Sequence, residues 1–292
     1  MIKLLVVLSI MLAGDYDIKL PEMENVKLEA YSKISDKKID ESSGLAKSRQ
    51  FDNVYWTLND SGDKARIFAI DINGKLIAPQ WDDDYKGLMI SDAVNIDWED
   101  ITADNNGFLY IAACGNNGNA RKDLSIYMLK EPNPLGVNAT RYFKKIDFFY
   151  PEQDGFPPVK RNFDCEAIFH NGKNLYLLTK HRSDFNTVLY RFDSMESNGQ
   201  TPVTKISEFP IGGNVTAADC SIDGKRLAVL TYQNVWVFES EDGNYFNGKK
   251  YFLPISADQC EAITFENNNE LIITNEQTEM FKIKISEMKI IE

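Results

Sequence analysis

The chain has 292 residues, of which 43% are hydrophobic and 12% aromatic, so it can bury a large core and is not extensively disordered. Its 32 basic and 44 acidic residues give a formal net charge of -12, which repels nucleic-acid backbones and anionic lipid surfaces. We therefore expect no nucleic-acid partner. Where acidic residues cluster, a cation is the favoured partner.

The first 14 residues have the pattern of a signal peptide. Met-Ile-Lys precedes an apolar run from Leu4 to Leu12, and Ala13-Gly14 supplies the small residues that precede a cleavage site. The run is too short to span a bilayer. We predict a signal peptide over residues 1–14, no integral membrane span, and export to the periplasm or the extracellular space. A buried N-terminal strand is the alternative.

A short motif recurs along the rest of the chain. Its clearest copy is Asp97-Trp98-Glu99-Asp100-Ile101, and altered copies begin at Glu41, Asp164, Ala218 and Gln259. A turn rich in Asp, Asn, Gly or Lys follows each copy, and strongly apolar runs of β type come next, which is the pattern of a β-meander. The apolar anchors are spaced by roughly 43 to 67 residues, which is closer to propeller blades than to most solenoid repeats.

The expected strands follow this repeat in chain order. In each repeat the motif forms the first strand. Taken repeat by repeat, the strands after it are expected at 53–58, 65–70 and 75–81; at 108–113, 124–129 and 142–149; at 174–179, 187–192 and 203–209; at 226–230, 234–238 and 250–253; and at 270–274 and 280–285. The last repeat lacks a fourth strand. The alternating segment 25–34 precedes the first repeat and has no meander of its own, so we predict that it supplies the missing strand and removes two open sheet edges.

These observations predict an all-β fold, a five-bladed β-propeller closed by an N-terminal strand. Residues 25–292 form a single domain in this interpretation, and we expect a monomer. The irregular segment between Pro151 and Arg161, with Gly155, Pro157 and Pro158, is interpreted as a long loop. The repeat spacing also leaves a six-bladed ring open.

Carboxylates occupy matching, period-two positions on the innermost strands and should face the central channel. The candidate metal ligands are Glu41, Asp97, Glu99, Asp164, Glu166 and Glu261. Without basic partners they would repel one another unless protons or a cation neutralised them. Oxygen ligands suit calcium or magnesium, so calcium is the candidate cofactor. In the alternative, some of these side chains bond neighbouring backbone N–H groups and hold the blades together.

A second set of loops should lie on the same face. The candidate ligand-binding residues from these loops are Asp60, Asp63, Asn116, Lys180, Arg182, Tyr232 and Glu276. Residues of the Asn, Asp and Gly types also build tight turns unaided, which is the alternative for each loop. His181 is one of only two histidines and is the candidate general base. An exposed loop histidine is the simpler interpretation.

The chain has four cysteines, at positions 114, 165, 220 and 260. An even number permits disulfides in an exported protein. However, Cys165 and Cys260 occupy equivalent positions in non-adjacent repeats, which lie far apart in a radial fold. We therefore expect free, buried thiols that act as small hydrophobic residues.

These motifs resemble a family of exported bacterial β-propellers without an established activity. The residues that carry the resemblance are Asn59-Asp60-Ser61-Gly62-Asp63, Asp97-Trp98-Glu99-Asp100-Ile101, Val215-Thr216-Ala217-Ala218-Asp219 and Gln259-Cys260-Glu261-Ala262-Ile263. The chain is more loosely similar to SdiA-regulated and phytase-like esterase propellers. Residues 112–117 stand where the family usually has Gly-Asp-Ile-Gly-Asp-Asn, so two acidic positions are absent. The resemblance implies the propeller fold and export, but no substrate.

Three functions remain open from the sequence. The first is a binding protein with an acidic, calcium-occupied channel, whose ligand is a glycan, a peptide or a small anion. The second is a metal-dependent hydrolase of a phosphoester or lactone, with His181 or a carboxylate as base. The third is an envelope scaffold. The sequence favours binding, because no complete catalytic constellation is visible and a fold alone does not specify a function.

Overall fold

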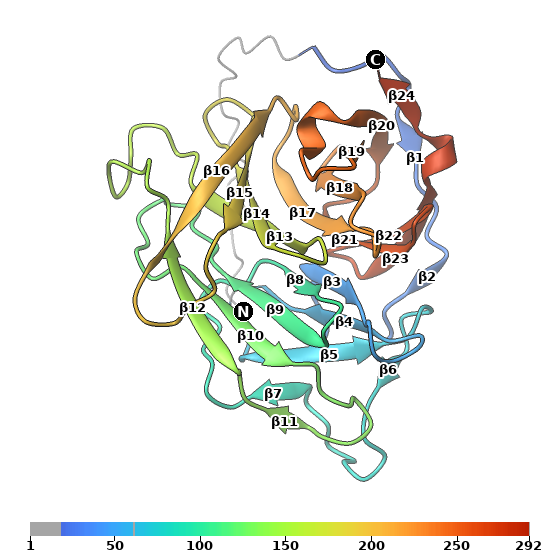
Figure 1. The fold of residues 1–292 in the computed structure, drawn as a ribbon. Coiled ribbons are helices and arrows are strands. Elements are labelled where there is room, and N and C mark those ends of the chain that lie inside the picture. Colours follow the sequence, from blue (N-terminus) through green and yellow to red (C-terminus); the bar gives the residue numbers. More distant parts are fainter. Residues whose placement is uncertain (1–18, 61, 292) are drawn as a thin grey trace, which may run out of the picture.

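The computed structural model describes residues 19–60 and 62–291 (Figure 1). The expected signal peptide at residues 1–14 lies outside this range. Within it, the chain forms 24 β-strands and two short 3-10 helices, Tyr245–Asn247 and Ile285–Glu287, and no α-helix. Among the described residues, none of the helices is long and apolar enough to cross a membrane.

The strands form five antiparallel groups that follow the sequence repeat. The first contains β3 (Gly44–Lys47), β4 (Tyr55–Leu58), β5 (Arg66–Ile70) and β7 (Leu88–Ile90), with β6 (Leu76–Ile77) and β11 (Ala139–Thr140) beside them. The second contains β8 (Ile101–Ala103), β9 (Phe108–Ala113), β10 (Ser125–Lys130) and β12 (Lys144–Phe149). The third contains β13 (Asp164–His170), β14 (Leu175–Lys180), β15 (Thr187–Phe192) and β16 (Thr201–Phe209).

The last two groups include strands from both ends of the chain. The fourth contains β17 (Val215–Cys220), β18 (Arg226–Thr231), β19 (Asn234–Glu239) and β20 (Lys249–Ser256), joined by β1 (Val26–Lys27) and β24 (Lys289–Ile291). The fifth contains β21 (Cys260–Asn267), β22 (Glu270–Asn275), β23 (Glu279–Lys284) and β2 (Ser32–Lys33).

The first strands of the groups form a closed ring in the middle of the molecule. Each of β3, β8, β13, β17 and β21 contacts the next, and β21 returns to contact β3 (Figure 1). The predicted all-β propeller class is therefore confirmed. By hydrogen bonding there are four sheets, because the parallel pair β12 and β16 joins the second and third groups into one eight-stranded sheet. A count of five blades divides this eight-stranded sheet into two blades, and the number of blades stays a prediction.

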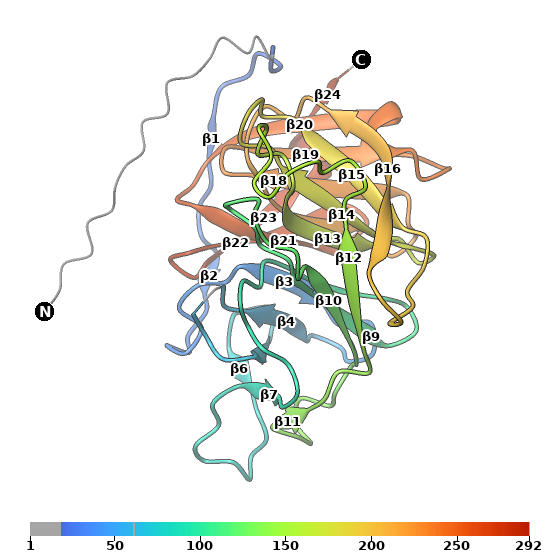
Figure 2. The same ribbon diagram turned by 90° about the vertical axis from the view of Figure 1, so that its left-hand side faces the viewer.

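The N-terminal segment closes the ring, but not as the single strand expected over residues 25–34. It makes two short strands in different groups: β2 pairs with β23 as the missing fourth strand, whereas β1 runs parallel to β20 in the neighbouring group. Figure 2 shows this segment running along one side of the molecule from β1 to β2. The sequence also missed β24, which pairs antiparallel with β20.

The edge of the first group also differs from the prediction. The expected strand at 75–81 is reduced to Leu76–Ile77, and β7 pairs with β5 further along the chain. Pro79 has no N–H to donate to a ladder, and the acidic run Asp82-Asp83-Asp84 follows it. A hydrogen-bonded strand therefore ends before Pro79.

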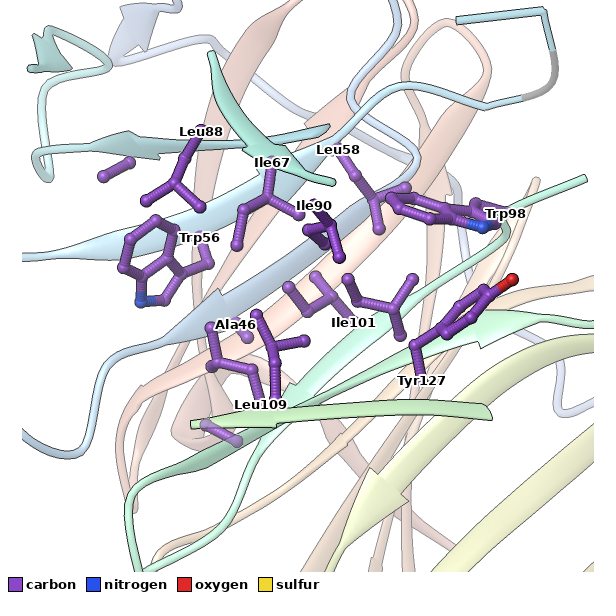
Figure 3. Packing of buried hydrophobic residues seen from close by; sticks show 14 of the residues in the cluster. Ala46, Trp56, Leu58, Ile67, Leu88, Ile90, Trp98, Ile101, Leu109 and Tyr127 are labelled. Atoms are coloured by element: carbon purple, nitrogen blue, oxygen red, sulfur yellow. The ribbon is translucent and has the colours of Figure 1, made fainter. Parts of the chain in front are cut away.

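The core between the first two groups fixes the orientation of the motif at residues 97–101. Trp98 is completely buried and packs with Leu58, Ile101 and Tyr127 (Figure 3). Its indole Nε1 donates to the Val94 carbonyl over 3.1 Å, which satisfies its polar atom inside the core. Because successive side chains of an extended segment point to opposite sides, the buried Trp98 turns Asp97 and Glu99 away from this core.

Two buried carboxylates connect neighbouring groups. The Asp100 Oδ2 atom accepts from the Ile168 N–H over 2.9 Å, and the Asp219 Oδ2 atom accepts from the Phe265 N–H over 2.8 Å. Burial raises the pKa of both carboxyl groups, and these backbone donors act against that rise. Bonds of this kind are the blade-joining role that the sequence analysis gave as the alternative for the motif carboxylates. Asp100 and Asp219 lie outside the candidate metal set, but Asp164, a member of that set, likewise accepts from the backbone N–H of Asn116 over 2.6 Å.

Candidate functional site

Three carboxylates converge beside the ring of inner strands. Asp60, Asp97 and Glu99 each offer an oxygen, and the three oxygens lie within 4.8 Å of one another. Asn95 holds the two contributing segments together. Its Nδ2 donates to the Asp60 carbonyl over 3.0 Å, and its Oδ1 accepts from the Trp98 N–H over 3.1 Å. We call Asp60, Asp97 and Glu99 the acidic triad.

Gly115 allows the triad to pack against backbone. A Cβ atom on Gly115 would lie 1.8 Å from the Glu99 Oε1 atom and 2.6 Å from the Asp97 Cγ atom, which is far inside contact distance. The Gly115 N–H also donates to the Asp97 carbonyl over 3.1 Å. Two carboxylates thus occupy the space that any other residue at position 115 would need.

The electrostatics of the triad follow from burial and like charge. Burial, and then the neighbouring Asp60, raise the pKa of Asp97 to about 6, although Arg121 opposes the rise with its Nη1 atom 3.9 Å from the Asp97 Oδ2 atom. Burial, and then Glu166 and Asp60, hold the pKa of Glu99 well above its ordinary value. The site therefore favours either protons or a cation over three bare negative charges.

A basic pair neutralises two of the other candidate ligands. Lys180 Nζ donates to Glu166 Oε2 over 2.9 Å, and Arg182 Nη2 donates to Asp164 Oδ2 over 2.8 Å. Asp164 Oδ1 also accepts from the Asn116 N–H over 2.6 Å. The expectation of carboxylates without basic partners was wrong for Asp164 and Glu166. Lys180, at the end of β14, and Arg182, in the connection to β15, reach these two side chains on the adjacent inner strand β13.

The remaining candidates form an acidic border around Asp60. Burial raises the pKa of Glu41, Glu261 and Glu276, and the charge of Asp60 adds to the rise in each case. Gln259 Nε2 donates to Glu261 Oε1 over 3.0 Å and also to Glu276 Oε1. These three glutamates are not members of the triad, but they add to its negative field.

Two other candidates are engaged in their own loops. Asp63 Oδ1 lies 2.7 Å from Arg66 Nη2, so Asp63 supports the β4–β5 turn. His181 is buried, and its Nδ1 lies 2.7 Å from Asp184 Oδ1. Burial lowers the pKa of His181 even though Asp184 opposes this, which keeps the ring neutral at pH 7. Within the described part of the chain, no hydrogen bond or ion pair joins His181 to the candidate metal ligands.

Tyr232 connects the basic pair to open grooves on this face. Its hydroxyl accepts from Lys180 Nζ over 3.3 Å, and its ring lies beneath the same ammonium group. Tyr232 and Gln233 line both a groove of about 780 Å³ along the N-terminal segment and a second one of about 310 Å³. A third, of about 390 Å³, is lined by Glu41, Asn59 and Asp63. Ligand-sized space therefore borders the charged centre.

Sequence reasoning missed Gly115, Asn95 and Arg121 as parts of the site. Asn95 could have been noticed, because it lies two residues before the clearest copy of the motif. Nothing in the pattern marks Arg121, whose position depends on how the 114–123 connection folds back. In the sequence, Gly115 is indistinguishable from an ordinary turn glycine, and only the structure shows the carboxylates beside it.

No protein-family model matches the sequence, and no curated protein does so. Among solved structures, the chain is similar to an X-ray structure of a protein provisionally described as a gluconolactonase, at 12% identity and a TM-score of 0.42. The match covers 82% of this chain and 72% of that one. This similarity is too low to bear on function, and membership of the exported propeller family stays a prediction.

Proposed function

We propose that this chain is an exported propeller binding protein that holds one divalent cation of the calcium class through Asp60, Asp97 and Glu99. The observation that supports it is the approach of three carboxylate oxygens to within 4.8 Å of one another beside the central ring. Calcium takes six to eight oxygen ligands, at about 2.3–2.6 Å. Three carboxylates leave coordination positions for water or for oxygen atoms of a ligand. The absence of His and Cys from the triad disfavours zinc.

The ligand is a glycan, a peptide or a small anion that brings its own oxygen donors. Arg182 and Tyr232 lie beside the charged centre, and the grooves along Tyr232 give a ligand room to lie against it. In this proposal the cation offsets the acidic field that would otherwise repel an anion. Asn116 and Glu276 then line the approach instead of binding the cation.

A metal-dependent hydrolase of a phosphoester or lactone is the second candidate, and the small number of protein ligands in the acidic triad favours it. A cation with open coordination positions would polarise a substrate oxygen and lower the pKa of a bound water. Turnover of an aryl phosphoester or a lactone that needs calcium and is lost in Asp97→Asn would establish this activity. Ligand binding without turnover would support the binding protein and not the hydrolase.

Cation binding should depend on each member of the triad. In Asp97→Asn and in Glu99→Gln, we expect calcium affinity, measured by titration calorimetry, to fall by about 10- to 100-fold, because each removes one charged ligand. Asp84→Asn is the charge-matched control. Asp84 is exposed and forms an ion pair with the exposed Lys86, so the calcium affinity of this variant should match that of the unmodified chain. Equal calcium affinity in all four proteins would refute the site.

The effect of calcium should also depend on pH. The folded-state pKa of Asp97 lies at about 6, above its ordinary 3.8, so the folded protein binds more protons than the unfolded chain between these values. The contribution of Asp97 to the stability of the calcium-free protein therefore falls as pH rises from about 4 to about 6. Calcium needs the deprotonated form, so its stabilising effect should be large at pH 7 and small at pH 5. Thermal unfolding with calcium and with chelator at both pH values measures this. A calcium-dependent shift that is larger at pH 5 than at pH 7 would contradict it.

A further inference from the structure

Cys114 and Cys165 bring two thiols together at the boundary between the second and third strand groups. Cys114 directly follows β9, and Cys165 is the second residue of β13. Their Sγ atoms are 2.7 Å apart, and both residues are completely buried in one hydrophobic cluster. A disulfide has a bond length of about 2.05 Å, so the sulfurs need to close by about 0.7 Å to form one.

We propose that Cys114 and Cys165 form a disulfide that links the two strand groups when the protein folds under oxidising conditions. The sequence pattern relates Cys165 only to Cys260, its counterpart in a non-adjacent repeat. The structure instead supplies Cys114 as its neighbour. The Cys220 Sγ atom lies 3.4 Å from the Tyr245 hydroxyl, and among the described residues neither Cys220 nor Cys260 hydrogen-bonds to another sulfur. The pairing is therefore specific.

The oxidant is a small disulfide such as oxidised glutathione, or a protein disulfide of an oxidising compartment. One cysteine thiolate attacks a sulfur of the oxidant, forms a mixed disulfide and releases one thiol. The second cysteine thiolate then attacks the sulfur of the first, which breaks the mixed disulfide and releases the second thiol. Two protons leave the cysteines, and two electrons pass to the oxidant.

Burial determines when this exchange takes place. In the folded chain neither sulfur is exposed, and burial raises the pKa of Cys114 well above its ordinary value, so an external disulfide meets little thiolate. Oxidation therefore occurs during folding, before the two groups close over the sulfurs. The finished bond then holds β9 and β13 together one residue away from Gly115 and Asp164. This inference does not depend on the cation proposal.

Labelling of the full chain tests the pairing. The reduced, denatured protein is refolded in a buffer containing reduced and oxidised glutathione, and the soluble folded fraction is denatured and treated with N-ethylmaleimide without reductant. Mass spectrometry should find two labels, on Cys220 and Cys260, and one linked peptide that contains Cys114 and Cys165. Four labels, or a linked peptide that includes Cys220 or Cys260, would overturn the proposal.

Two variants sharpen the test. Cys165→Ser should take three labels and give no linked peptide, whereas Cys220→Ser should take one label and keep the linked peptide. The oxidised chain should also melt roughly 5 to 10 °C above the reduced chain, because the crosslink closes a long loop in the unfolded state. In Cys165→Ser this redox-dependent difference should vanish. A difference that persists there would overturn the assignment to this pair.

Discussion

Replacing Gly115 with alanine is expected to weaken calcium binding by about 100-fold and to lower the free energy of unfolding by about 1–3 kcal/mol. The new methyl group would lie 1.8 Å from the Glu99 Oε1 atom and 2.6 Å from the Asp97 Cγ atom, so both carboxylates must move. Their displacement opens the acidic triad without removing any charge. The effect on affinity should therefore exceed that of a single neutral substitution. Titration calorimetry with calcium, together with urea unfolding, measures both quantities.

Gly118→Ala is the matched control, since it lies in the same connection and makes the same chemical change. A Cβ atom at Gly118 meets nothing within 4 Å, and neither glycine has a positive φ, so backbone strain is not a factor at either position. The calcium affinity and the free energy of unfolding of this variant should match those of the unmodified chain within measurement error. If Gly115→Ala binds calcium as tightly as Gly118→Ala, the carboxylates beside Gly115 do not hold the cation.

Replacing Lys180 with methionine is expected to lower the free energy of unfolding by about 3–5 kcal/mol. Lys180 and Glu166 form a pair whose side chains are 7% and 4% exposed. Loss of the Lys180 ammonium leaves the buried Glu166 carboxylate with only Arg182, whose Nη2 atom lies 3.7 Å from Glu166 Oε1. The cost arises from this poorly compensated charge of Glu166. Adding Glu166→Gln to the same chain removes that charge and should recover a large part of the loss. Urea unfolding of the unmodified chain, the two single variants and the double variant measures this.

The loss in Lys180→Met should depend on pH in a defined direction. Burial already holds the folded-state pKa of Glu166 well above its ordinary value, and removal of Lys180 raises it further. The folded variant therefore takes up a proton at low pH, and its destabilisation should be small near pH 4 and grow as pH rises. Lys225→Met breaks the exposed pair with Glu241 and should leave stability nearly unchanged at any pH, because water screens an exposed ion pair. A Lys180→Met protein as stable as Lys225→Met would contradict a buried ion pair.

The repeated motif made the fold predictable because strand pairing and burial leave periodic signals. The alternating apolar runs located the inner strands and the hairpins within one to three residues in most groups. Trp98 is buried, and side-chain direction along an extended segment alternates with a period of two, so Asp97 and Glu99 point away from that core. Edge elements were less predictable. Strand β7 and the separate strands β1 and β2 are short, and tertiary neighbours decide whether such segments pair.

The sequence by itself determined an all-β propeller whose last group is completed by an N-terminal strand, and it predicted which carboxylates face the channel. The tertiary structure alone decided how those residues combine. Asp60 joins Asp97 and Glu99, whereas Lys180 and Arg182 neutralise Glu166 and Asp164, and Cys114 meets Cys165. Side-chain direction is a local property of one strand. Distances between residues of different strand groups are set only when the ring closes.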